Sequence, residues 1–258
     1  MRYLLTSLLC VLTLGLTAQD DCQGPDFNND GAIGAADIIV FLTYYGVEWP
    51  LVTEFSCGET IAHQDYAYQT VQIGDQCWFA ENCRYLPEVS IPTDESTTEP
   101  YYYVFNYEGT DVEAAMATSN YETYGVLYNW TAVMTSEICP SGWHIPSDEE
   151  WQTMLMSLGM SEAEVSSELW IGTDEGYQMK SASGWDNNGN GSNLSGFTGL
   201  PGGYYDSGFY SDDDYGHWWS SSNSGSISMR RFLSSDSNEI FRGNLSHFYG
   251  FSARCVRD

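Results

Sequence analysis

The chain has 258 residues with 36 acidic and 8 basic side chains, which gives a formal net charge of −28 at pH 7. So acidic a chain repels phosphate groups and anionic lipid headgroups, which excludes nucleic acids and membrane surfaces as expected partners. Its length suits one medium-sized domain with a small additional segment.

The N-terminus has the pattern of a secretory signal peptide. It reads MRYLLTSLLCVLTLGLTAQ, with one arginine before an apolar run that ends at Thr17-Ala18-Gln19. The pattern predicts cleavage after Ala18, so residues 1–18 form the signal peptide. Since no later apolar run approaches the length of about 18 residues that a membrane span needs, we expect a secreted or cell-surface protein.

Residues 19–50 contain the spacing of a calcium loop followed by a helix. In DFNNDGAIGAAD, acidic or amide side chains take the first, third, fifth and twelfth places, and Gly31 allows the sharp turn. The pattern predicts Ca²⁺ held by Asp26, Asn28, Asp30, the backbone carbonyl of Ala32, and Asp37. The alternative is an Asx-rich turn that leads into the helix without a metal.

Residues 51–258 have the composition of short strands and long loops. Val71, Ile73 and the stretch 78–80 predict two strands around a turn at Gly74-Asp75. Residues 87–101 are polar and predict a loop, whereas residues 124–133 change from strand-like to helical.

The clearest helix begins at Ser147 and ends at Gly159. Ser147 and Glu150 have the spacing of a capping box, and the apolar positions from Trp151 to Leu158 share one face. A shorter helix is predicted at 162–168. Alternating residues then predict β-hairpins with strands at 217–221, 227–234, 239–244 and 251–256.

Aromatic side chains cluster in the later loops together with acidic and amide groups. Aromatic faces can stack on sugar rings while carboxylates accept hydroxyl hydrogen bonds, which predicts a ligand site at Tyr204, Tyr205, Trp218, Trp219 and Asp186. The alternative is that these aromatic residues fill a core rich in loops, and that the polar loop from Asp186 is simply solvated.

No catalytic motif is present in the sequence. The four histidines lack HExxH or other metal-binding spacing, and there is no GxSxG motif. The sequence therefore predicts a protein that is not an enzyme.

Several motifs resemble those of one family. They are GDQCWFAENCRYLP, YGVLYNW, CPSGWHIPSDEEW, GFTGLPGGYY, HWWSSS and the terminal GFSARCVRD. From about residue 60 onward the chain resembles the Fibrobacter succinogenes major paralogous domain, which is similar to the C-type-lectin-like fold of sulfatase-modifying domains. The resemblance implies an α+β domain over residues 51–258, with few helices and twisted antiparallel strands. Residues 26–46 resemble one half of a dockerin.

Six cysteines remain after the signal peptide, which indicates disulfides in an oxidising compartment. Their number allows 15 pairings. Lectin-like folds place a structural bridge where the resemblance aligns Cys139 and Cys255, which implies that pair. Cys57–Cys77 is the next expected bridge, and Cys22–Cys83 remains.

Together these features predict a secreted, non-catalytic, calcium-binding surface or adhesion module. The expected partner is a polysaccharide or a cell-surface glycan. Two alternatives remain: an adhesion module that binds another surface protein without glycan, and a secreted enzyme related to sulfatase-modifying proteins.

Overall fold

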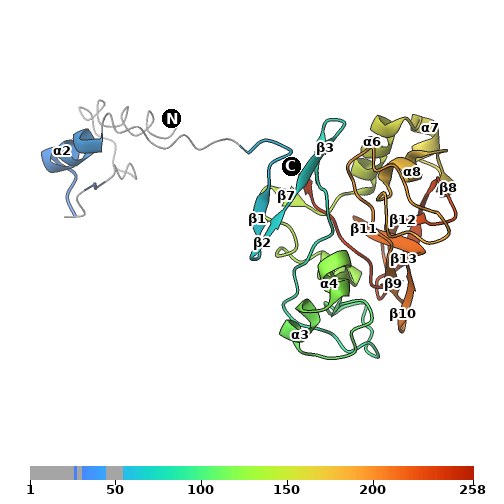
Figure 1. Ribbon diagram of the computed structural model, residues 1–258. Helices are drawn as coiled ribbons and strands as arrows, with labels where there is room; N and C mark the ends of the chain where they lie inside the picture. Colours follow the sequence, from blue (N-terminus) through green and yellow to red (C-terminus); the bar gives the residue numbers. More distant parts are fainter. Residues whose placement is uncertain (1–25, 28–30, 45–54) are drawn as a thin grey trace. The chain divides into compact units, whose positions relative to one another are not determined.

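A computed structural model describes residues 26–27, 31–44 and 55–258 (Figure 1). The expected signal peptide, Cys22, Asn28 and Asp30 lie outside the described residues. The chain divides into two units, Met1–Glu54 and Phe55–Asp258, and each is described by itself.

In the first unit, a helix follows the acidic loop as the sequence predicts. This helix, α2, spans Ala35–Tyr44. The side chain of Asp37 is almost fully buried, and its Oδ2 accepts a hydrogen bond of 2.7 Å from the backbone N–H of Gly34. The Phe27 and Phe41 rings lie 5.6 Å apart, so the loop and the helix pack together.

The largest sheet of the second unit has six strands in the order β10-β9-β11-β12-β13-β8. Its strands are β8 (Leu169–Ile171), β9 (Gly202–Tyr205), β10 (Phe209–Asp212), β11 (Tyr215–Ser224), β12 (Ile227–Ser234) and β13 (Ile240–Ser246). All neighbours pair antiparallel except β9 and β11, which are parallel.

A second sheet has four strands in the order β3-β4-β14-β7, and two small sheets pair β1 with β2 and β5 with β6. These strands are β1 (Ile61–His63), β2 (Tyr66–Tyr68), β3 (Thr70–Ile73), β4 (Gln76–Phe79), β5 (Tyr102–Tyr103), β6 (Leu127–Tyr128), β7 (Trp143–His144) and β14 (Val256–Arg257). The helices are α3 (Val112–Met116), α4 (Ser119–Tyr124), α5 (Trp130–Val133), α6 (Asp148–Leu158), α7 (Glu162–Val165) and α8 (Glu175–Met179). The second unit is therefore α+β, with mainly antiparallel sheets and few helices.

Helix α6 forms for the local reasons that the sequence indicates. The Ser147 side chain accepts from the Glu150 N–H while the Glu150 carboxylate accepts from the Ser147 N–H, and Gly159 ends the helix with φ of 126°. The helix contacts both β3 and β11. The fully buried Trp151 packs 5.0 Å from the ring of Trp78 on β4, so α6 contributes to the core between the two larger sheets. Figure 1 shows α6, α7 and α8 gathered on one side of the six-stranded sheet that contains β11 and β12.

The predicted strands at 217–221, 227–234 and 239–244 are confirmed as parts of β11, β12 and β13, but a strand over 251–256 is wrong. Only Val256 belongs to a strand, and Phe251 and Ser252 form isolated bridges to Tyr128 and Trp218. Residues 251–255 are each buried to 98% or more because this segment crosses the core between sheets. A segment buried on all sides lacks the alternation of a half-buried strand.

Two of the three expected disulfides are confirmed: Cys57–Cys77 and Cys139–Cys255. The expected Cys22–Cys83 bridge is wrong, because Cys83 is a free thiol with no exposed surface. Its sulfur lies 3.6 Å from that of Cys255, inside the core. Burial raises the pKa of Cys83 to about 12, so the thiol stays protonated and unreactive at neutral pH.

Candidate functional site

The strands β11 and β12 direct alternate side chains to two different faces of the six-stranded sheet. On one face, Trp218 and Leu233 join the core around α6. The intervening residues therefore point to the opposite face, where they bring His217 of β11 next to Arg230 of β12. Two residues on adjacent strands of one hairpin thus meet on one surface.

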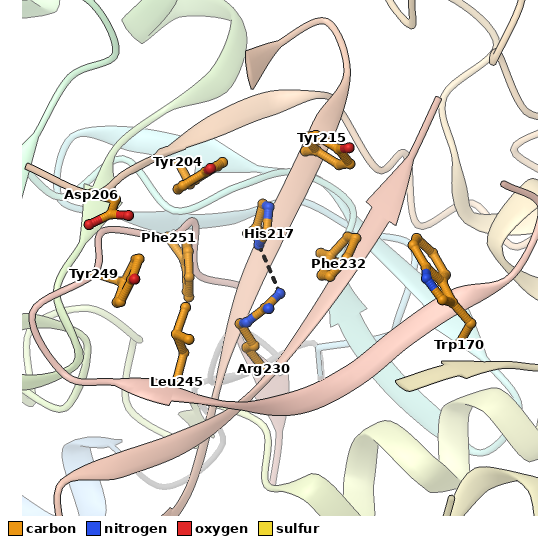
Figure 2. Close-up of a pocket in the computed structure, with 10 residues that line it drawn as sticks. All are labelled: Trp170, Tyr204, Asp206, Tyr215, His217, Arg230, Phe232, Leu245, Tyr249 and Phe251. Atoms are coloured by element: carbon orange, nitrogen blue, oxygen red, sulfur yellow. Dashed lines mark hydrogen bonds between the residues drawn. The ribbon is translucent and has the colours of Figure 1, made fainter. Parts of the chain in front are cut away.

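This opposite face carries an open cavity of about 340 Å³ (Figure 2). His217 and Arg230 lie near its centre, and Asp206 and Leu245 also line it. Most of the wall is aromatic and comes from several elements: Trp170 of β8, Tyr204 of β9, Tyr215 of β11, Phe232 of β12, and Tyr249 and Phe251 near the C-terminus. Pockets of this size and composition are typical of small-molecule or sugar-sized ligands.

His217 is held as a neutral ring between two aromatic side chains. It is 6% exposed and stacks on Phe232 at 4.7 Å and on Phe251 at 4.8 Å. Burial, together with the nearby Arg230, holds the pKa of His217 well below its usual range. Since the neutral Nδ1 accepts a hydrogen bond of 3.2 Å from Arg230 Nη1, the ring hydrogen lies on Nε2, which has no partner among the described residues.

Arg230 places its charge over aromatic rings. Its guanidinium carbon lies 4.7 Å from the ring centre of Phe232 and 5.0 Å from that of Phe241, which are cation–π distances. Burial lowers the pKa of Arg230 to about 10, so the side chain remains a cation at neutral pH. In the part of the chain that the structure describes, His217 is its one hydrogen-bond partner.

Phenol groups and one carboxylate supply the other polar groups of the cavity. Burial, followed by the neighbouring Asp206 carboxylate, raises the pKa of both Tyr204 and Tyr249. Their hydroxyls therefore stay protonated and can donate hydrogen bonds. The Tyr204 ring stacks on the half-exposed ring of Tyr210 at 5.6 Å, which extends the aromatic surface outward.

Comparison with known protein families places this cavity within a recognised domain. The family of the Fibrobacter succinogenes major domain matches residues 71–257. The chain belongs to this family. Searches among curated proteins and among solved structures found no match. The match contains every residue that lines the cavity, so the cavity belongs to the Fibrobacter succinogenes major domain itself.

The structure places one of the aromatic residues predicted to bind a ligand in the cavity and the other three in the core. Tyr204 lines the cavity, but Tyr205, Trp218 and Trp219 are fully buried and are corrected to core residues. Tyr205 stacks on Tyr103 at 3.9 Å.

Internal hydrogen bonds hold the two tryptophans in the core. The indole N–H of Trp218 donates to Asn82, and that of Trp219 donates to the carbonyl of Tyr128. Asp186 is exposed but lies outside the cavity lining.

Sequence reasoning missed the two polar residues at the centre of the cavity. His217 has no metal-binding spacing, and no catalytic or binding motif includes Arg230. The alternation Tyr215-x-His217 and Arg230-x-Phe232 places each pair on one face of its strand, which is the only local signal. The meeting of the two strands depends on pairing across the sheet.

A second cavity of the Fibrobacter succinogenes major domain, of about 330 Å³, lies beside Trp143 and the Cys139 bridge. One of its lining residues is His144, whose Nδ1 lies 2.5 Å from Asp258 and whose Nε2 lies 2.8 Å from Glu150. Burial opposes protonation, but the hydrogen bonds that His144 donates to the carboxylates of Asp258 and Glu150 outweigh it and raise the pKa of His144. Both ring nitrogens are thus engaged, and the residue ties the C-terminal residue to α6.

In the first unit, the described residues form part of the loop in which the sequence predicts a calcium site. Gly31 has φ of +83°, and its N–H donates to Asp26 Oδ2 at 2.8 Å, so the loop turns sharply at the predicted position. The described donors, Asp26, the Ala32 carbonyl and Asp37, are the hard oxygens that Ca²⁺ prefers. No group of three or more acidic, histidine or cysteine side chains suited to a metal occurs within residues 26–27, 31–44 and 55–258. The expected ligands Asn28 and Asp30 lie outside those ranges.

Among the described residues, no helix combines the length and the apolar character that crossing a membrane requires.

Proposed function

We propose that the protein is a secreted, non-catalytic surface or adhesion module that binds carbohydrate in the aromatic cavity. The observation that carries this proposal is the open cavity itself, with the Tyr204 ring and the 39% exposed Trp170 as apolar faces and Asp206 as an acceptor. An aromatic face covers the C–H surface of a sugar ring, while a carboxylate accepts hydrogen bonds from its hydroxyls.

The arrangement around His217 supports binding rather than catalysis. A general base needs a hydrogen-bonded nucleophile or an approach to substrate through its own ring nitrogen. In this cavity, Nδ1 of His217 is occupied by Arg230 and Nε2 is enclosed. The alternative of an enzyme predicts turnover of a bound saccharide, whereas a binding module returns it unchanged.

We also propose a C-type-lectin-like architecture and secretion, as the sequence predicts. A C-type-lectin-like architecture is supported by the α+β composition and the mainly antiparallel sheets. Secretion is supported by the pattern of residues 1–18 and by two disulfides.

Replacing Tyr204 with alanine should weaken glycan binding by roughly 10-fold, since losing one aromatic contact in a small site costs about 1–2 kcal/mol. A glycan array identifies the bound saccharide, and calorimetry measures its affinity for the wild type and for Tyr204→Ala. Tyr177→Ala is the matched control, because Tyr177 is 40% exposed and lies outside the cavity. Equal losses in both variants, or no glycan bound by the wild type, would contradict the proposal.

We further propose that Asp26, Asn28, Asp30, the Ala32 carbonyl and Asp37 bind Ca²⁺ and order the first unit. A segment of this size cannot bury a large core, and a bound metal would supply the missing stability.

The calcium proposal predicts a measurable loss of affinity in Asp37→Asn. This change keeps an oxygen that can accept from the Gly34 N–H but removes the charge, so calcium affinity should fall at least about 10-fold. Calorimetry with Ca²⁺ makes the measurement, with Asp65→Asn in the second unit as control. Absence of heat in the wild type at millimolar calcium would refute the site.

A further inference from the structure

Arg230 differs from the other cations that the structure describes in how its charge is compensated. The others donate hydrogen bonds to carboxylate, carbonyl or amide oxygens: Arg84, Lys180, Arg231, Arg242, Arg254 and Arg257. Arg230 instead contacts one neutral ring nitrogen, that of His217 at 3.2 Å. Its charge has no oxygen partner on the described protein.

This arrangement is unfavourable for the protein alone. No carboxylate of the described residues lies within 4.0 Å of Arg230, although the whole chain has 36 acidic side chains. The Nε atom of Arg230 is enclosed and has no acceptor in the described part of the chain. A partly buried cation without a counter-charge is costly, so an anion that entered the cavity would be stabilised strongly.

His217 orients the guanidinium of Arg230. Its Nε2–H is enclosed and has no acceptor among the described residues. By accepting from Nη1, His217 fixes the plane of the guanidinium, which lies beside it at the centre of the cavity (Figure 2). A pre-oriented guanidinium matches the planar oxygen pair of a carboxylate or two oxygens of a sulfate ester.

We propose that the cavity binds an acidic saccharide, and that Arg230 recognises its negatively charged substituent, a carboxylate or a sulfate ester. This inference rests on the proposed carbohydrate function and specifies its ligand. Arg230 binds the anion, Tyr204 covers the sugar ring, and Asp206 accepts from its hydroxyls. His217 is a positioning residue that holds the guanidinium.

The other polar groups of the cavity favour a saccharide over a peptide C-terminus. Besides Arg230, the lining supplies the Asp206 carboxylate and the neutral phenols of Tyr204 and Tyr249. A carboxylate in the same lining disfavours ligands with several negative charges in the cavity. A sugar ring with one negative charge and several hydroxyls would satisfy both the Arg230 guanidinium and the Asp206 carboxylate.

The test compares three oligosaccharides of equal length by calorimetry: a carboxylated oligogalacturonate, a sulfated galactan fragment and a neutral galactan fragment. Measurements are made at about 0.15 M salt, where the Debye length is about 8 Å, so that the net charge of −28 does not repel the acidic probes over long distances. We expect one of the acidic probes to bind roughly 10- to 100-fold more tightly than the neutral one, the effect of a charge-assisted hydrogen bond. The probe that binds identifies the anion as carboxylate or sulfate.

Arg230→Gln should remove this preference, so that the acidic probes bind no more tightly than the neutral probe. Arg230→Lys keeps the charge without the planar fork and should retain part of the preference. Arg257→Gln, at an exposed cation outside the cavity, should retain all of it. Thermal unfolding verifies that each variant is folded.

Three other outcomes are distinguishable, and each contradicts a different part of the inference. Equal wild-type affinities for acidic and neutral probes would overturn the role of Arg230 but leave carbohydrate binding standing. If none of the probes and no array glycan bound, carbohydrate binding itself would fail. Binding of a peptide with a free C-terminal carboxylate, in place of all three sugars and dependent on Arg230, would overturn the saccharide assignment.

Discussion

Replacing Asp148 with asparagine should lower the free energy of unfolding by about 3–5 kcal/mol, the usual cost of removing one partner from a buried ion pair. Asp148 is 5% exposed at the start of α6. Its carboxylate lies 2.7 Å from Arg231 and 2.7 Å from Arg242, and the Arg231 side chain is fully buried. The substitution keeps the shape of the side chain but leaves two guanidinium groups without their counter-charge.

The melting temperature measures this loss, and we expect it to fall by roughly 10 °C for a domain of this size. Glu149→Gln is the matched control, because Glu149 is exposed in the same first helical turn and is not part of an ion pair within the described chain. A result for Asp148→Asn equal to this control would show that the ion pair does not stabilise the fold.

The same carboxylate makes stability depend on pH. Burial opposes ionisation of Asp148, but the hydrogen bonds and charges of Arg242 and Arg231 outweigh it and lower its pKa. The pKa of Asp148 in the folded state lies below its unfolded-state value of about 3.9. The stability that Asp148 contributes is therefore fully present at pH values above about 3.9. It is lost as the pH falls through the folded-state pKa. The stability difference between the wild type and Asp148→Asn should therefore shrink as the pH is lowered below about 4.

Removing the Cys139–Cys255 disulfide should cost about 4–5 kcal/mol, because the bridge closes a long loop and restricts the unfolded chain. The two cysteines are 116 residues apart. The double variant Cys139→Ser/Cys255→Ser should melt roughly 10–15 °C below the wild type. Differential scanning calorimetry under non-reducing conditions makes the measurement.

Two further variants make the disulfide prediction specific. Cys57→Ser/Cys77→Ser opens a loop with a separation of 20 residues and should cost less, about 3 kcal/mol. Cys83→Ala removes a free thiol and should change stability by only about 1 kcal/mol, the cost of a small core truncation. A large loss in Cys83→Ala, or peptide mapping that pairs Cys83, would contradict the structure.

The elements that the sequence predicted correctly are those whose cause is local. Helix α6 follows from a capping box at Ser147 and Glu150, an apolar face and a terminal glycine, all within 13 residues. The β3–β4 hairpin follows from two apolar runs around Gly74, whose positive φ of 60° suits the turn. Periodicity and turn chemistry carry these signals without knowledge of the rest of the chain.

The candidate site was only partly predictable, because burial depends on what packs against each face. Tyr204 and Tyr205 are neighbours with the same side chain, yet one lines the cavity and the other stacks under Tyr103. Trp219 points to the same face as His217, but Phe251 packs against it at 4.5 Å and covers it. The local sequence pattern does not show that the segment after β13, which contains Phe251, packs against β11.

The sequence by itself determined the family, the α+β class, the main helix and its caps, and two of the disulfides. It also determined the large negative charge. Only the tertiary structure decided which aromatic residues are core, that Cys83 is free, and that Arg230 stands beside His217 with no oxygen partner among the described residues. The physical reason is that helix caps, turns and periodicity depend on neighbours in sequence, whereas burial and charge compensation depend on neighbours in space.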